Sequence, residues 1–509
     1  STTVEGAPGG GGGTQASNVI MASPKRSTSG RAIMTGGPQI GYFYPGFVLE
    51  VDIAGPNYEA RGVTTAPFPG YVFIGRREDF AFTLTSAGAD IVDHYVETLC
   101  GSDTKYVYKG QCRDMERFDA GKLRGTDGVT RPVVFNRTVH GPVIGYAMVD
   151  GRRVAISRKR SSYGRDVEDQ LLYRDITKGK IDGPRDLFRA ASQSPQTFNT
   201  FYVDHRNVAM YTSGSLPVRP KSVDSGLPVD GRGGYEWAGR LPASKHPQGI
   251  NPRSGLLVNW NNKPAAEFPG ADDQFGYGTT GRVDLLNGRL KNRRRHDTAS
   301  IVSAINAAAT QDVRQRILPV LARLLRTGRA PSARAERMLE LLEQWRDRGS
   351  SRLDRDLDGK IDDPGAAVMD AAWSNMGDAL IKPLLGGQLA NQLNSLFSRY
   401  SAPPGGQFSG WYQYLDRDLR KLLRLRVADP FRNRFCGRGN LGRCRASLWS
   451  ALERAGNDLA AEQGPNPDAW RSDAESERIE FRPGLLSTTM RYANRASGIH
   501  QIIEFDGHR

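Results

Sequence analysis

Ser17 stands where a flexible leader gives way to an apolar, strand-like run, and this position suits a nucleophile. The leader includes five consecutive glycines at 9–13, which add backbone freedom and no side chain to pack. If the chain is cut before Ser17, that residue supplies both a hydroxyl nucleophile and an α-amine with an ordinary pKa of about 8. An ordinary serine at a strand entry is the alternative. Ser1 is a weaker rival because it leads only into the leader.

Other serine and metal hydrolase chemistries find little support in the sequence. The G-x-S-x-G motif is absent, and the seven histidines form neither H-E-x-x-H nor another ligand cluster. A serine mechanism without histidine needs a different base, which again indicates the α-amine of Ser17.

A series of short motifs follows this serine in a fixed order. Ser17-Asn18 is followed by the apolar run 19–22, a polar turn, the run 32–34 and then Gly36-Gly37-Pro38-Gln39. This order resembles the start of the nucleophile-bearing chain in the penicillin acylase family of N-terminal-nucleophile hydrolases. The resemblance matches Gln39 to a glutamine whose backbone carbonyl orients the substrate.

Two further motifs resemble the family's oxyanion hole, whose donors stabilise the charge of the tetrahedral intermediate. The run 259–264 has the form N-W-N-N-x-P, in which Asn261 matches the side-chain donor. The run 85–88 resembles the family's S-T-A-G, in which the backbone N–H of Ala87 is the second donor. Arg282 matches an arginine that supports the asparagine and the amine. A buried turn asparagine and a structural ion pair are the alternative interpretations of Asn261 and Arg282.

The resemblance also implies one calcium ion near the nucleophile. Hard oxygen ligands from separate segments suit Ca²⁺. In the family the site is completed by a glutamate of the other chain. The matching positions here are Asp90, Val92, Asp93, Ser225 and Asp272.

A second acidic cluster has the D-x-D-x-D-G spacing of an EF-hand-type calcium loop, with Gly359 at the sharp turn. Gly365 replaces the acid expected at the twelfth position, so we expect weak binding or ligands from elsewhere. A plain acidic turn is the alternative. The candidate ligands are Asp354, Asp356, Asp358 and Asp362.

The residues that match the family's acyl pocket are all apolar or aromatic. This composition favours a hydrophobic acyl group over a glutaryl group, although ordinary core packing explains each residue equally well by itself. The positions are Pro38, Ile40, Val72, Phe73, Tyr163 and Phe198.

The four cysteines form two close pairs, Cys100 with Cys112 and Cys436 with Cys444, each beside a glycine-containing turn. Because neither pair has the C-x-x-C spacing of zinc or redox sites, we expect two local disulfides and hence a secreted or periplasmic protein.

The net charge of +15 comes from basic residues that are mostly scattered along the chain. No nucleic-acid-binding motif accompanies them, and no apolar run reaches the roughly 20 residues of a transmembrane helix. We therefore expect neither a nucleic-acid nor a membrane partner.

The elements that position these residues divide the chain into four regions. Residues 1–16 form the leader, 17–295 are strand-rich, 296–430 are mainly helical, and 431–509 contain a helix and closing strands. Such a mixture predicts an α+β fold. The resemblance makes it more specific: the αββα sandwich of N-terminal-nucleophile hydrolases with a helical insert.

The resemblance implies a secreted amidohydrolase that cleaves a linear amide, in penicillin or another N-acyl compound, through an acyl-enzyme on Ser17. The resemblance also implies a smaller α chain from the same precursor as the partner. The chain begins without methionine, and we expect it to be a processed product. An acyl-homoserine-lactone or lipopeptide acylase is one alternative. A catalytically inactive calcium-dependent binding homologue is another, and cleavage before Ser17 distinguishes it.

Overall fold

The structure is a computed structural model of the 509-residue chain. It describes residues 16–39, 48–56, 58–65, 70–265, 268, 281–396, 412–427, 430–474, 478–481, 490–493 and 500–506. Ile40, Asp272 and leader residues 1–15, which the sequence analysis singled out, lie outside these ranges. Within them, no helix is both long and apolar enough to cross a membrane.

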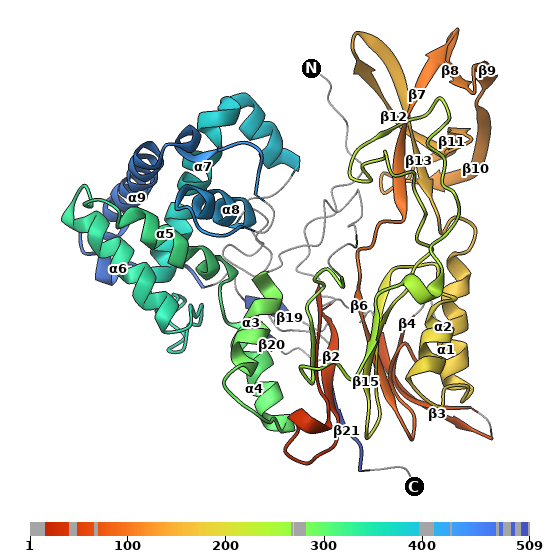
Figure 1. The fold of residues 1–509 in the computed structure, drawn as a ribbon, viewed down its shortest axis with the longest axis horizontal. Coiled ribbons are helices and arrows are strands. Elements are labelled where there is room, and N and C mark those ends of the chain that lie inside the picture. The colour runs from red at the N-terminus through yellow and green to blue at the C-terminus, as the bar shows by residue number, and fades with distance from the viewer. Residues whose placement is uncertain are drawn as a thin grey trace.

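Ser17 lies in a four-stranded antiparallel sheet (Figure 1). The predicted hairpin is present, since β1 (Ala16–Ala22) pairs with β2 (Ile33–Gln39) and Ser17 lies opposite Pro38. β18 (Leu256–Asn259) flanks β1, and β21 (Gln501–Glu504) flanks β2. The order β18-β1-β2-β21 therefore brings together segments from the two ends and the middle of the chain.

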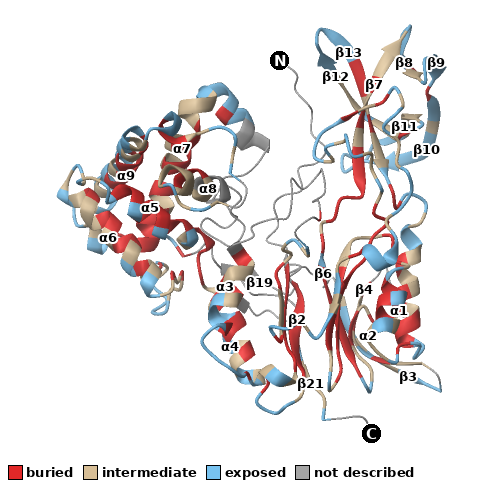
Figure 2. Cartoon of the chain, in the orientation of Figure 1, coloured by how far each residue is buried: buried red, intermediate tan, exposed pale blue. Residues whose placement is uncertain are grey.

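The two faces of β1 pack into different cores, because successive side chains of a strand point to opposite sides. Ile20 and Ala22 contact α3 (Gly281–Leu290) and α4 (Thr298–Ala309). Val19 and Met21 pack instead against Phe201 and its neighbours in a second sheet. The strand is thus buried on both sides, as Figure 2 shows for this part of the molecule.

The second sheet has seven strands, and its far face is covered by α1 (Gln170–Thr177) and α2 (Pro184–Ala191). The layers are therefore helix, sheet, sheet and helix, and the predicted αββα sandwich is confirmed. In spatial order the strands are β17 (Gln248–Ile250), β15 (Val208–Thr212), β14 (Phe198–Val203), β6 (Ala81–Ser86), β5 (Ile74–Arg76), β4 (Tyr58–Thr65) and β3 (Val48–Gly55).

A third sheet extends beyond the sandwich (Figure 1). The predicted disulfide Cys100–Cys112 is present and joins two of its strands. The residue types of the run 133–144 predict a strand, but the run contains the turn at 139–140 between two strands of this sheet. The strands are β7 (Val92–Cys100), β8 (Ser102–Tyr108), β9 (Gln111–Asp114), β10 (Glu116–Arg124), β11 (Thr130–Thr138), β12 (Gly141–Val149) and β13 (Arg152–Arg160), with β16 (Val229–Asp230) parallel to β7.

The helical part forms one core to which helices on both sides of residue 430 contribute, including Trp345, Trp373 and Trp449. The second predicted disulfide, Cys436–Cys444, is also present. The helices are α5 (Leu318–Leu325), α6 (Ala333–Asp347), α7 (Pro364–Leu396), α8 (Tyr412–Leu422) and α9 (Leu441–Gln463). A small hairpin of β19 (Arg478–Phe481) and β20 (Met490–Ala493) follows.

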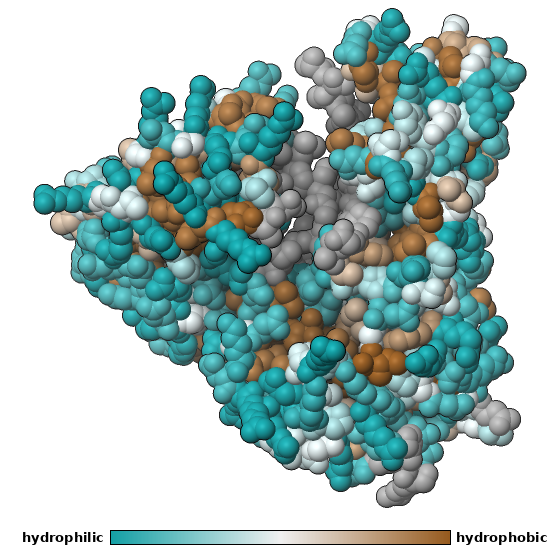
Figure 3. Space-filling model, in the orientation of Figure 1, coloured by the Kyte–Doolittle hydropathy of each residue, from teal (hydrophilic) through white to brown (hydrophobic). Residues whose placement is uncertain are grey.

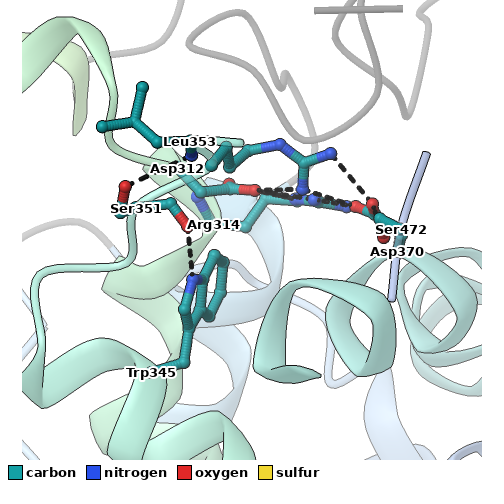
Figure 4. Close-up of polar contacts among 8 residues, drawn as sticks. Asp312, Arg314, Trp345, Ser351, Leu353, Asp370 and Ser472 are labelled. Carbon is teal, nitrogen blue, oxygen red and sulfur yellow. Dashed lines mark hydrogen bonds and ion pairs between the residues drawn. The ribbon is translucent and has the colours of Figure 1, made fainter. Parts of the chain in front are cut away.

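Two arginines and Asp312 are buried together in this helical part, beside the partly exposed Asp370 (Figure 4). Arg314 Nη2 lies 2.6 Å from Asp312 Oδ2 and also contacts Asp370. Arg352 Nη1 lies 2.9 Å from Asp370 Oδ1 and 3.3 Å from Asp312 Oδ2. The formal charges balance, which is the condition under which buried ions are tolerated.

Hydrophilic side chains cover most of the described surface on the face in Figure 3, with the apolar groups in separate areas.

Candidate active site

Ser17, the second residue of β1, is almost completely buried, with 7% of its surface exposed. Its backbone N–H donates a hydrogen bond to Asn261 Oδ1 at 2.9 Å. Cleavage of the peptide bond between Ala16 and Ser17 would turn this nitrogen into the α-amine. The atom that would serve as base therefore already has a fixed partner.

Asn261 follows β18 with a φ of +57°, a left-handed conformation that asparagine tolerates better than most residues. Its backbone N–H donates to Asn259 Oδ1 at 2.9 Å, which closes a tight turn. The side chain then reaches three segments: Oδ1 accepts from Ser17 N and, at 3.1 Å, from Arg282 Nη2, while Nδ2 donates to Ser86 O at 3.0 Å.

Arg282 lies at the start of α3 with 4% of its surface exposed. Its Nη2 also donates to Trp260 O at 2.9 Å, and the guanidinium lies 5.5 Å from the centre of the Trp260 ring. The structure thus brings Arg282 to the asparagine that the sequence analysis expected it to support. The positively charged guanidinium of Arg282 and the Ser17 nitrogen therefore donate hydrogen bonds to the same oxygen, Asn261 Oδ1.

The backbone N–H of Ala87 donates to Thr197 O at 3.0 Å. A backbone amide has one hydrogen, so this bond has to open before Ala87 can bind an oxyanion. A primary amide has two, and one of those of Asn261 makes the bond to Ser86. The roles of both donors stay predictions, with Asn261 the better prepared of the two.

A network of buried polar side chains, which the sequence did not reveal, supports the turn that contains Asn261. Thr85 Oγ1 donates to Asn259 Oδ1 at 2.8 Å and accepts from Asn199 Nδ2 at 3.1 Å. Thr212 Oγ1 in turn donates to Asn199 Oδ1 at 2.8 Å. Asn259 and Thr85 stand inside the two motifs and could have been singled out there. No local sequence motif marks Asn199, because Thr85, its partner in this network, lies more than a hundred residues away.

The expected pocket residues are only partly brought together. Val72, Phe73 and Phe198 pack in the cluster between the seven-stranded sheet and its helices. Pro38 is buried opposite Ser17. Tyr163 does not join that cluster: it is 60% exposed, with the Arg137 guanidinium 5.3 Å from its ring centre.

The expected calcium ligands Asp90 and Asp93 both contact Arg219. Arg219 Nη2 lies 2.7 Å from Asp90 Oδ1, and Nε lies 2.9 Å from each carboxylate oxygen of Asp93. Val92 begins β7, and Ser225 lies half-buried between β15 and β16. A calcium ion in this position stays a prediction.

The EF-hand-type loop brings Asp354, Asp356 and Asp362 together, with one carboxylate oxygen of each within 4.8 Å of the others. Gly359 has a φ of +89°, as the sharp turn requires. Asp358 is exposed and accepts from the backbone N–H of Lys360 at 2.7 Å. These groups could hold a cation, and the second calcium ion also stays a prediction.

His140 is buried between two glutamates where β11 turns into β12. Nδ1 lies 2.8 Å from Glu97 Oε1, and Nε2 lies 2.8 Å from Glu236 Oε1. Burial alone lowers the pKa of His140, but the hydrogen bonds to the two carboxylates outweigh it and the pKa is raised. The bond to His140, opposed by burial and assisted by Lys159, lowers the pKa of Glu236 to about 2.

The penicillin amidase family model matches residues 4–503. Penicillin G acylase of Escherichia coli is 27% identical over 365 residues, which are 71% of this chain and 42% of that protein. Acyl-homoserine lactone acylase QuiP of Pseudomonas aeruginosa is 27% identical over 311 residues, 57% of this chain and 35% of that protein. The chain thus spans less than half the length of these curated relatives.

A solved structure, thermostable penicillin G acylase from Alcaligenes faecalis, superimposes with a TM-score of 0.80 at 24% identity. The match covers 96% of this chain and 88% of that chain, and it shows that the two share a fold.

Proposed function

Because the chain belongs to the penicillin amidase family, we propose that it is the nucleophile-bearing chain of an amidohydrolase acting on linear N-acyl amides. The hydrogen bond between the Ser17 nitrogen and Asn261 Oδ1, with Arg282 on the same oxygen, is the observation that carries the proposal. It joins the residue that would attack to the residue that would hold the oxyanion.

The proposed reaction begins after the Ala16–Ser17 bond is cut. Ser17 Oγ attacks the amide carbonyl carbon while the α-amine of Ser17 takes the hydroxyl proton. The carbonyl oxygen becomes an oxyanion that accepts hydrogen bonds from Asn261 Nδ2 and, once its bond to Thr197 opens, from Ala87 N. The backbone carbonyl of Gln39 orients the substrate.

Collapse of this intermediate breaks the C–N bond. The α-amine returns its proton to the leaving nitrogen, so an amine departs and the acyl group stays on Ser17 Oγ. Water then attacks the ester by the same steps, which releases the carboxylic acid and restores the serine.

We propose a hydrophobic acyl group, phenylacetyl or of medium chain length, because Phe73, Val72 and Phe198 form an apolar cluster and Phe198 lies opposite Ser86 in the sheet. Acyl-homoserine lactones are the second candidate, because QuiP is about as similar as the penicillin G acylase. Both substrate classes contain the same secondary amide.

The same proposal includes the partner chain, the location and the metal ion of the enzyme. A smaller α chain from the same precursor would complete it, in agreement with the shorter span of this chain relative to its relatives. The two disulfides favour a secreted or periplasmic location. A calcium ion in the EF-hand-type loop belongs to the same proposal.

N-terminal sequencing of the active protein, with its partner chain, tests the mechanism. We expect the catalytic chain to begin at Ser17, Ser17→Ala to be neither processed nor active, and Ser17→Cys to be processed but slow on amides. A fully active chain that retains residues 1–16 contradicts the mechanism. An unprocessed, inactive native chain instead supports the binding homologue.

The acyl group is tested with phenylacetyl, hexanoyl, decanoyl and glutaryl amides of one chromogenic amine, and with the matching homoserine lactones. Turnover of the glutaryl amide that equals the others contradicts a hydrophobic acyl group.

A further inference from the structure

Arg219 lies where the family resemblance predicts a divalent cation. Three N–O contacts of 2.7–2.9 Å join its guanidinium to Asp90 and Asp93. The side chain of Arg219 is 10% exposed, and those of Asp90 and Asp93 are 0% and 2% exposed. These are buried, charge-assisted hydrogen bonds of the strongest class found in proteins.

The backbone around Arg219 holds the guanidinium in place. Val218 exchanges two hydrogen bonds with the segment 238–239: its N–H donates to Gly239 O at 2.9 Å, and its carbonyl accepts from Ala238 N at 2.8 Å. Pro217 and Pro220 flank this pairing and restrict the chain further. The arginine therefore enters the acidic pair from a fixed strand-like segment.

The groups around Asp90 and Asp93 also favour the singly charged guanidinium of Arg219 over a calcium ion. Trp237 Nε1 donates to Asp93 Oδ2, so this oxygen already accepts from two N–H groups. The Lys159 ammonium lies 4.6 Å from the Trp237 ring centre and adds a second positive charge nearby. Ca²⁺ needs six to eight oxygen ligands at about 2.3–2.6 Å, and here N–H groups of Arg219 already bond three of the four carboxylate oxygens of Asp90 and Asp93.

The residues present thus do not fit calcium while Arg219 is in place, and we propose that the guanidinium of Arg219 substitutes for the metal. It ties the β6–β7 connection, which contains Ala87 and Asp90, to the segment between β15 and β16. A divalent ion would join the same segments. The site then does not need calcium, and its integrity depends on one side chain.

The test uses the full protein in a background that removes the other calcium candidate, Asp354→Asn with Asp356→Asn. In this background we compare Arg219, Arg219→Met and the charge-preserving control Arg219→Lys. Thermal unfolding is measured in CaCl₂ and in EGTA. Terbium(III) serves as a luminescent calcium substitute. Trp237 can sensitise its emission, because this side chain donates a hydrogen bond to Asp93.

With Arg219 in place we expect the same unfolding temperature in CaCl₂ and EGTA, and no sensitised terbium emission. Arg219→Met should be less stable in EGTA, regain stability in CaCl₂ and show terbium emission that a further Asp93→Asn abolishes. The unfolding temperature of Arg219→Lys in EGTA should lie between those of the Arg219 protein and Arg219→Met, and this variant should show no terbium emission.

A fall in the unfolding temperature on chelation while Arg219 is present overturns the proposal, as does terbium emission that Asp90→Asn removes in that protein. Arg219→Met that folds and ignores calcium also overturns it. If Arg219→Met does not fold, the chelation and terbium measurements on the Arg219 background protein decide alone.

Discussion

Substitution of Asn261 separates its catalytic role from its structural one, because three variants remove different properties of the residue. Asn261→Gly removes the side chain and keeps the left-handed backbone, which glycine adopts without strain. Asn261→Ala removes the same groups and adds the strain of a Cβ at φ +57°. Asn261→Asp keeps an acceptor for Ser17 N and replaces the donor.

The contacts of the residue give the expected magnitudes. Loss of one oxyanion donor lowers turnover by about 10²–10³, or roughly 2.7–4 kcal/mol in the transition state. Asn261→Gly should therefore reduce kcat by at least this factor. Asn261→Ala should lose about 1 kcal/mol more stability than the glycine variant, the lower end of the cost of a left-handed alanine.

Asn261→Asp should be as slow as the glycine variant for a different reason. Its second carboxylate oxygen would face Ser86 O, which accepts from Nδ2 at 3.0 Å in the parent. Two acceptors at that distance repel each other, and no N–H remains to bind an oxyanion. The negative charge should also raise the pKa of the α-amine of Ser17 and shift the acidic-side limb of the pH–rate profile upward.

The assay measures kcat and KM for a chromogenic phenylacetyl amide across the pH range, together with the unfolding temperature of each processed protein. Processing is checked by N-terminal sequencing, because an unprocessed chain would be inactive for an unrelated reason. Processed, folded Asn261→Gly with a kcat within threefold of the parent refutes the oxyanion role. A loss in kcat without any change in KM or stability supports it most directly.

Three further predictions concern other parts of the molecule. Because the pKa of His140 is raised in the folded protein, protonated His140 stabilises the fold fully below its ordinary pKa, and this contribution is lost as pH rises through the raised pKa. Between about pH 6 and pH 9, the unfolding temperature should therefore fall more steeply for the parent than for His140→Gln. Calcium at 100 times its Kd should stabilise the parent by about 2.7 kcal/mol and leave Asp354→Asn/Asp356→Asn unchanged, and a parent without this response in calorimetry contradicts the EF-hand-type site. Asp312→Ala leaves the buried Arg314 and Arg352 with only the partly exposed carboxylate of Asp370 and should cost about 3–5 kcal/mol in chemical unfolding. This is far more than Asp468→Ala should cost in the exposed pair with Arg337, and equal costs would contradict the assignment.

Local patterns predicted the strands that carry Ser17 and lead to Asn261, but they did not predict α3, which carries Arg282 within the region 17–295 expected to be strand-rich. The β1–β2 hairpin follows from two apolar runs around a polar turn. The residue types of the run 208–212 predict a strand, and β15 has these bounds (Val208–Thr212). The apolar and aromatic run 71–74 also predicts a strand, but only Ile74 of this run belongs to β5 (Ile74–Arg76). Val72 is buried there through tertiary packing without strand pairing, which residue type alone does not reveal.

Long-range polar pairing was beyond the reach of the sequence. Motif matching identified Asn261 and Arg282, and the structure brings them into contact. It also identified Asp90 and Asp93 but not Arg219, which lies more than a hundred residues further along the chain. Val218 and Arg219 between two prolines form no recognisable motif, so the contact of the guanidinium with the two aspartates becomes visible only in three dimensions.

The position of β21 at the edge of the nucleophile's sheet has a consequence for the timing of biosynthesis. β1 and β2 are synthesised long before β21, the strand that covers the edge of β2. Until then β2 presents an unpaired edge, which is prone to pair with other chains. Because Ser17 belongs to this same sheet, its assembly, and with it the proposed cut, waits for translation to reach residues 501–504. A truncated nascent chain would therefore remain an unprocessed precursor.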